Sequence, residues 1–154
     1  LILIVLHSYP SLLKTLNVEP TTKNNPYDRV DGWKEVIEKA QSIVSVPDDS
    51  LVLSNNRLVL SYMVLYNDLA ISRLAAWNSD KTIDNHFELV ADLGDKTPEQ
   101  IDGRTIYFVS RSELSPKILE RFTNKKILSI LREPVYVDLE RVLYIYRLSG
   151  FKGY

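Results

Sequence analysis

The 154-residue sequence contains no cysteine, only five glycines and only two histidines. Without cysteine there can be no disulfides, thiolate metal sites or thiol catalysis. This absence does not indicate a compartment, because many extracytoplasmic bacterial domains also lack cysteine. The 19 basic and 20 acidic side chains give a net charge of -1, which offers little attraction to polyphosphate. We therefore expect no nucleic-acid partner.

The scarcity of glycine excludes the common phosphate-binding loops. Such loops bring backbone amides close to the ligand, usually through glycine, but the first predicted strand-to-helix turn reads Ser54-Asn55-Asn56-Arg57. The sequence carries neither a P-loop nor a dinucleotide fingerprint. We expect no cofactor on this chain.

The first six residues, Leu1 to Leu6, are all apolar. They are too few to span a bilayer, which takes about 20 residues, and they lack the basic segment and cleavage site of a secretory signal. Two interpretations stay open on pattern alone. The run is either a buried strand or core-helix start, or it is the end of a transmembrane helix with His7 and Tyr9 at the interface.

The rest of the chain has the composition of one globular domain, with 45% hydrophobic and 25% charged residues. Residues 17–31 hold two prolines and three asparagines with little apolar content, which predicts a connector. Apolar residues then recur at helical spacing, which predicts a helix over 32–44 with Asp31 as its N-cap.

A strand, a helix and a second strand are expected next. Residues 51–53 form a short apolar run, Ser54-Asn55-Asn56 can cap a helix that carries Leu58 and Tyr62, and residues 73–77 resemble a strand. Together they predict a βαβ unit.

The C-terminal half continues the alternation of strand and helix. We expect a short helix over 84–92, a central strand over 105–110, and a helix opened by Ser115-Pro116 with Phe122 on its buried stripe. Strand-like segments at 127–131, 135–137 and 142–146, broken at Glu133-Pro134 and at 138–140, predict an antiparallel hairpin. The expected fold is α/β: a three-layer, Rossmann-like, open and mostly parallel sheet with an antiparallel C-terminal edge.

The densest polar cluster is Asp84-Asn85-His86-Phe87-Glu88. On a strand, Asp84, His86 and Glu88 would share a face and could hold a divalent metal; on a helix, His86 would point away from the other two. A zinc site usually needs a second histidine or a thiol, so we favour a solvated loop and predict no metal.

Several short motifs occur in an order that resembles one family. They are His7-Ser8-Tyr9-Pro10, Asn25-Pro26-Tyr27-Asp28-Arg29, Gly32-Trp33-Lys34-Glu35, Asn55-Asn56-Arg57 with Tyr62 and Tyr66, Trp77-Asn78, His86-Phe87-Glu88-Leu89, and Gly103-Arg104 through Ser110. The chain is similar to the C-terminal end of bacterial members of the protein-mannosyltransferase-like superfamily, glycosyltransferase family 39, which includes the aminoarabinose transferases that modify lipid A.

The resemblance implies that residues 1–16 are the end of the last transmembrane helix with its juxtamembrane segment, 17–31 a linker, and 32–154 a soluble α/β domain. This domain would lie on the periplasmic side of the inner (plasma) membrane, with the transmembrane part of the same chain as partner. The whole enzyme would transfer a sugar from a polyprenyl-phosphate donor to a lipid, glycan or protein acceptor. The family's catalytic acidic residues lie in an early outer loop, so none is expected here.

Any ligand contacts on the domain itself are expected at Asn55 and Arg57, together with His86 and Glu88, because open α/β sheets bind ligands at the carboxyl ends of their strands. Asn55 could equally be a plain helix N-cap. Two other functions stay open: a carbohydrate- or protein-binding module without an enzymatic parent, and a small metal-dependent hydrolase built on Asp84, His86 and Glu88.

Overall fold

The computed structural model describes residues 9–44 and 50–154. The apolar run Leu1 to Leu6 and His7 therefore lie outside the described residues. Within the two described ranges, no helix combines the length and the apolar character needed to cross a bilayer.

The chain alternates helices and strands up to a long C-terminal hairpin. The helices are α2 (Tyr9–Thr15), α3 (Trp33–Val44), α4 (Arg57–Asn67), α5 (His86–Val90), α6 (Pro98–Ile101) and α7 (Pro116–Leu119), with 3-10 turns η1 (Ile71–Arg73) and η2 (Leu93–Asp95). The strands are β1 (Leu51–Ser54), β2 (Leu74–Ala76), β3 (Ile106–Ser110), β4 (Phe122–Tyr136) and β5 (Leu139–Phe151).

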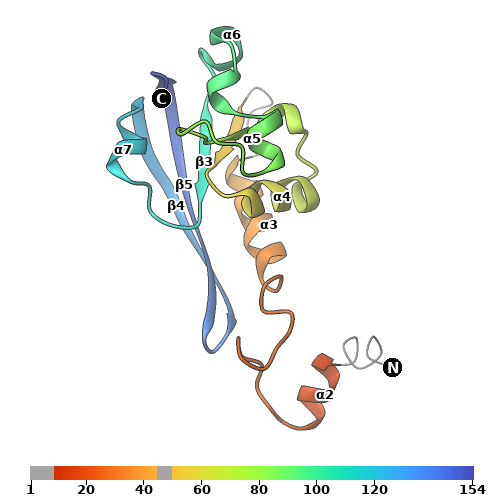
Figure 1. Cartoon of the computed structure of the whole chain (residues 1–154). Helices are drawn as coiled ribbons and strands as arrows, with labels where there is room; N and C mark the ends of the chain where they lie inside the picture. The colour runs from red at the N-terminus through yellow and green to blue at the C-terminus, as the bar shows by residue number, and fades with distance from the viewer. Residues whose placement is uncertain (1–8, 45–49) are drawn as a thin grey trace.

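The strands form one open five-stranded sheet in the order β2-β1-β3-β5-β4. The β1 strand pairs in parallel with β2 and with β3, whereas β5 pairs antiparallel with β3 and β4 (Figure 1). This confirms the α/β class, the βαβ unit and the C-terminal hairpin. The sheet is mixed rather than mostly parallel, because only two of its four pairings are parallel.

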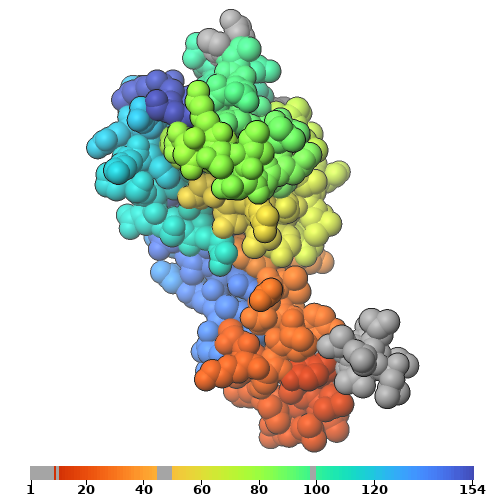
Figure 2. Space-filling view, viewed as in Figure 1, coloured from red at the N-terminus to blue at the C-terminus, as the bar shows by residue number. Residues whose placement is uncertain are grey.

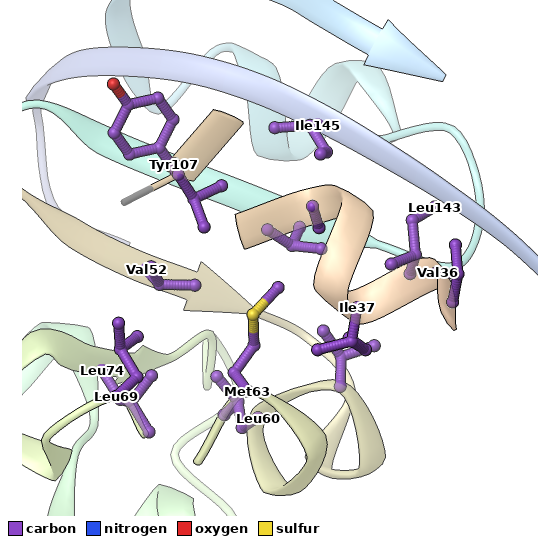
Figure 3. Close-up of a cluster of buried hydrophobic side chains, with 14 of the residues drawn as sticks. Val36, Ile37, Val52, Leu60, Met63, Leu69, Leu74, Tyr107, Leu143 and Ile145 are labelled. Atoms are coloured by element: carbon purple, nitrogen blue, oxygen red, sulfur yellow. The ribbon is translucent and has the colours of Figure 1, made fainter. Parts of the chain in front are cut away.

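The first apolar cluster lies where α3 and α4 cover one face of the sheet. Helix α3 contributes Val36 and Ile37, α4 contributes Leu60 and Met63, and all four are at most 1% exposed. They pack on side chains from β1, β2, β3 and β5 (Figure 3). The apolar face predicted for residues 32–44 is therefore the face that is buried.

The second apolar cluster lies on the opposite face, because successive side chains along a strand point to opposite sides. Leu51 and Leu53 of β1 and Phe108 of β3 belong to it and are fully buried. Short segments cover them instead of long helices, including Leu93 of η2 and Leu114 before α7. Strands β1 and β3 are thus buried on both faces, as their continuous apolar runs predict.

Tyr154 ties the C-terminal end of the chain into this second face. Its hydroxyl accepts a hydrogen bond from the backbone N–H of Asn78 at 2.9 Å and donates to Asp92 Oδ1 at 2.9 Å. Its ring meets Trp77 edge-on, with 4.9 Å between ring centroids. Burial raises the pKa of the Tyr154 hydroxyl above its ordinary value, and the carboxylate of Asp92 adds to the increase.

The C-terminal elements differ from their predicted bounds. Phe122, expected on a helix, begins β4 and is fully buried, while α7 ends at Leu119. Glu133 and Pro134 do not break the strand, since β4 runs through both to Tyr136 with a register irregularity after Pro134. Ser115 precedes α7 as predicted, but its side chain makes no capping hydrogen bond.

The connector lies against the tip of the hairpin. Figure 1 shows α2 and the following loop at the same end of the molecule as the turn between β4 and β5, and Figure 2 shows these segments in contact. Residues 17–31 therefore pack on a part of the chain more than 100 residues away in sequence.

The core predicts how two leucines should respond to truncation. We expect Leu53→Ala to lower the free energy of unfolding by about 2–5 kcal/mol, because it opens a cavity between two packed layers. Leu65→Ala removes a side chain that is 67% exposed and should change it by less than about 0.5 kcal/mol. Urea unfolding followed by circular dichroism measures both; equal effects would contradict the assignment of the core.

Candidate functional site

The predicted ligand residues Asn55 and Arg57 lie at the carboxyl end of β1, as expected, and both are exposed. The Oδ1 atom of Asn55 accepts a hydrogen bond from Ser110 Oγ at 3.3 Å, which links the ends of β1 and β3. Asn56 is the N-cap of α4, because its Oδ1 accepts from the backbone N–H groups of Leu58 at 3.0 Å and Val59 at 3.4 Å. Asn55 is therefore not the cap.

The other predicted pair, His86 and Glu88, opens the short helix α5. Glu88 Oε2 accepts from the backbone N–H groups of Asp84 at 2.7 Å and Asn85 at 3.1 Å, while Asn85 Oδ1 accepts from Phe87 and Glu88. This is a capping box, so the carboxylate of Glu88 serves the helix end.

His86 is exposed, and its ring lies edge-on to Phe87 at 5.9 Å between centroids. No hydrogen bond among the described residues brings the Asn55 and Arg57 pair to the His86 and Glu88 pair. In the described ranges, no group of three histidine, aspartate or glutamate side chains is arranged to hold a metal ion.

The structure instead gathers partly buried polar groups where the connector meets the hairpin. The hydroxyl of Tyr136, at the end of β4, donates a hydrogen bond to Asp31 Oδ2. Asn25 Nδ2 donates to Tyr136 Oη at 2.6 Å and to Asp31 Oδ2 at 3.3 Å. Asp31, predicted as the N-cap of α3, thus uses its carboxylate to join the connector to the hairpin. We call Asn25, Asp31 and Tyr136 the connector triad.

Arg141 of β5 also joins the hairpin to the connector. Arg141 is only 8% exposed. Its guanidinium donates hydrogen bonds to the backbone carbonyl of Asp31 at 3.0 Å and to that of Asp28. The guanidinium also lies over the Trp33 ring, 5.0 Å from its centroid. Burial lowers the pKa of Arg141, and the nearby Arg111 guanidinium adds to this, although arginine stays protonated at neutral pH.

A third contact closes the junction at the tip of the hairpin. The Asp138 carboxylate accepts hydrogen bonds from the backbone N–H of Thr22 at 3.1 Å and from its hydroxyl at 2.7 Å. The hydrogen bond from the Thr22 side chain is the main reason why the pKa of Asp138 lies below its ordinary value.

A surface cavity of about 460 Å³ opens beside the connector triad. Its walls come from the end of α2, the first part of the connector and the end of β4. The lining residues are Leu13, Lys14, Asn17, Val18, Glu19, Pro20, Asn25, Asp31 and Tyr136. This volume falls within the range of about 300–1,000 Å³ that is typical of small-molecule sites.

The triad also perturbs the tyrosine. Burial raises the pKa of the Tyr136 hydroxyl, and the hydrogen bond to Asp31 and the negative charge of that carboxylate raise it further. A cavity with convergent polar groups and a perturbed hydroxyl is the strongest candidate site in the described part of the chain.

Sequence reasoning missed this site because its parts are far apart along the chain. Asn25 and Tyr136 are separated by 111 positions, and no local pattern links them. The composition of residues 17–31 indicates only a loop. The one available signal is that a loop rich in asparagine and aspartate can hydrogen-bond other segments.

The different roles of the two asparagines after β1 can be tested. Asn56→Ala should lower the free energy of unfolding by about 1 kcal/mol, because two N–H groups of α4 lose their acceptor. Asn55→Ala removes a single 3.3 Å hydrogen bond at an exposed position and should cost clearly less. Urea unfolding of the two variants checks the order; a larger loss for Asn55→Ala would contradict it.

The connector triad predicts a sensitivity to alkaline pH. The pKa of Tyr136 is higher in the folded chain than the ordinary value of 10.0, so the folded state holds its proton where the unfolded state has lost it. The stability that the Tyr136 proton contributes is therefore complete below about pH 10. It is lost progressively as the pH rises above that value. Tyr136→Phe should reduce this decline, while lowering stability at neutral pH by about 1–3 kcal/mol through the unpaired Asp31 and Asn25 groups.

Urea unfolding at pH 8 and pH 10.5 measures both effects. Tyr154 contributes a decline of the same sign and is present in both proteins, so the comparison isolates Tyr136. Equal declines in the wild type and the variant would contradict the assigned role of the hydroxyl.

Comparisons with known proteins identify no relative of the chain. No family model, no curated protein and no solved structure matches the chain.

Proposed function

We propose that the chain is the extracytoplasmic, non-catalytic domain of an integral-membrane glycosyltransferase of bacterial plasma membranes. The intact enzyme would transfer a sugar from a polyprenyl-phosphate donor to a lipid, glycan or protein acceptor. The domain would lie on the periplasmic side, with the transmembrane part of the same chain as its partner. We also propose that the fold is three-layered and Rossmann-like. The apolar clusters on both faces of the sheet support this description.

One structural observation supports the proposal most directly. The connector is bonded to the hairpin through Tyr136, Arg141 and Asp138, so the segment that follows the apolar run is anchored to the domain. A domain attached to a membrane needs such an anchor if it is to keep one orientation over the enzyme. A flexible tether would leave that orientation free.

We call the end of the molecule that holds α2 and the turn between β4 and β5 the α2 pole (Figure 1). This pole also carries exposed apolar side chains. Leu16 is 61% exposed and Val137, in the hairpin turn, is 80% exposed. Leu16 follows α2 and Val137 is in the hairpin turn, and both segments lie at the same end of the molecule (Figure 1), where exposed apolar groups favour contact with a membrane or a protein partner. We infer that this pole faces the transmembrane part.

A binding module without an enzymatic parent is the second candidate. The cavity beside the connector triad supports it, because a ligand site of this volume needs no membrane partner. The two functions differ in what precedes Leu1.

The gene that encodes the chain tests the first proposal. We expect the coding sequence upstream of Leu1 to contain several apolar spans of about 20 residues and an acidic pair in the first outer loop. Membranes that contain the intact protein should transfer a labelled sugar from a polyprenyl phosphate, and alanine at the acidic pair should abolish the transfer. A start codon or a soluble domain directly upstream of Leu1 would overturn the proposal and favour the binding module.

A further inference from the structure

The cavity beside the connector triad has an apolar wall and a polar end. Leu13 of α2, with Val18 and Pro20 of the connector, supplies the apolar wall. Asn25, Asp31 and Tyr136 supply the polar end. Asn25 is only 8% exposed, so this end is built into the fold and is not a loose surface cluster. A ligand that fills the cavity must therefore have an apolar part and a polar part.

The polar end is arranged to accept hydrogen bonds from a ligand. An ionised carboxylate is an acceptor only, with room for about four hydrogen bonds on its two oxygens. Both donors of the triad bond to Oδ2 of Asp31. Among the described residues, Oδ1 receives no hydrogen bond from any side chain. A hydroxyl group of a ligand can supply one.

The charges around the cavity disfavour an anionic ligand. Its lining includes the carboxylates of Glu19 and Asp31 but only one ammonium group, that of Lys14. In the described part of the chain, no lysine or arginine lies within 4 Å of either carboxylate. A phosphate or sulfate would bring a like charge toward both, whereas an uncharged polar group would not.

The apolar wall continues onto the surface of α2. Leu16 is 61% exposed, lies one residue beyond α2 and comes three residues after Leu13, a spacing that places the two side chains on one side of a helical turn. Leu13 itself lines the cavity. An apolar chain that leaves the cavity can thus contact Leu16.

We propose that this cavity binds an amphiphile whose head is uncharged and rich in hydroxyl groups, as in a glycolipid. The head donates hydrogen bonds to Asp31, and the apolar chain contacts Leu13 and Val18. The inference goes beyond the proposed function, since it concerns a ligand site on the isolated chain and needs no membrane partner.

Binding can be measured on the purified 154-residue chain by NMR titration. The ligands are an alkyl glucoside kept below its micelle concentration, glucose alone, and an alkyl phosphate with the same alkyl chain. We expect saturable shifts with the alkyl glucoside at residues that line the cavity, and affinities lower by about tenfold or more for the other two ligands.

Two matched substitutions locate the site. Val18→Trp fills the cavity from the connector side and should weaken alkyl glucoside binding by about tenfold or more. Val30→Trp adds the same side chain at a position of similar exposure that does not line the cavity, and should leave the affinity within about twofold. Urea unfolding shows whether either variant is destabilised, and Val18→Phe replaces Val18→Trp if the larger ring unfolds the chain.

Three results would overturn the inference. They are the absence of saturable binding, equal affinities of the Val18 and Val30 variants, and binding of the alkyl phosphate as tightly as the glucoside. None of these results bears on the coding sequence upstream of Leu1, so failure here is distinguishable from failure of the proposed function.

Discussion

The arrangement of the chain where the connector meets the hairpin depends on the buried guanidinium of Arg141. A buried charge is tolerated only when its donors are satisfied, and no carboxylate lies within 4 Å of this one among the described residues. The backbone carbonyls of Asp28 and Asp31 take that role, and the face of Trp33 covers the guanidinium. The connector must therefore follow a path that brings two carbonyls to the hairpin. That path also places Asp31 beside Tyr136 and so shapes the cavity.

Much of the fold could be predicted because it depends on local pattern. The apolar spacing over residues 33–44 identifies α3 and its buried face, and the continuous apolar run over 106–110 identifies a strand buried on both sides. The length of β4 could not be predicted in the same way. Pro134 resembles a break, but β4 is the edge strand of the sheet, where a residue without an N–H group is tolerated.

The candidate site was harder to predict than the fold. Glu88 is among the ligand residues expected from the sequence, yet its position three residues after Asn85 makes it part of a capping box, a signal that the sequence does carry. Asn55 and Arg57 lie at the strand end where the prediction placed them. The connector triad depends on pairings such as Asn25 with Tyr136, which form only when the hairpin folds back onto the connector.

The two edges of the sheet differ in what they offer to a strand from another molecule. An open edge offers unpaired backbone groups to a strand from another molecule. On one side the edge strand β2 has only three residues. On the other side β4 has 15 residues, but its register is irregular between Ile127 and Ser129 and again after Pro134, and Lys125 and Lys126 add charge. A second copy of the chain thus meets either a very short edge or one that is irregular in register and charged, and both features disfavour strand pairing between copies.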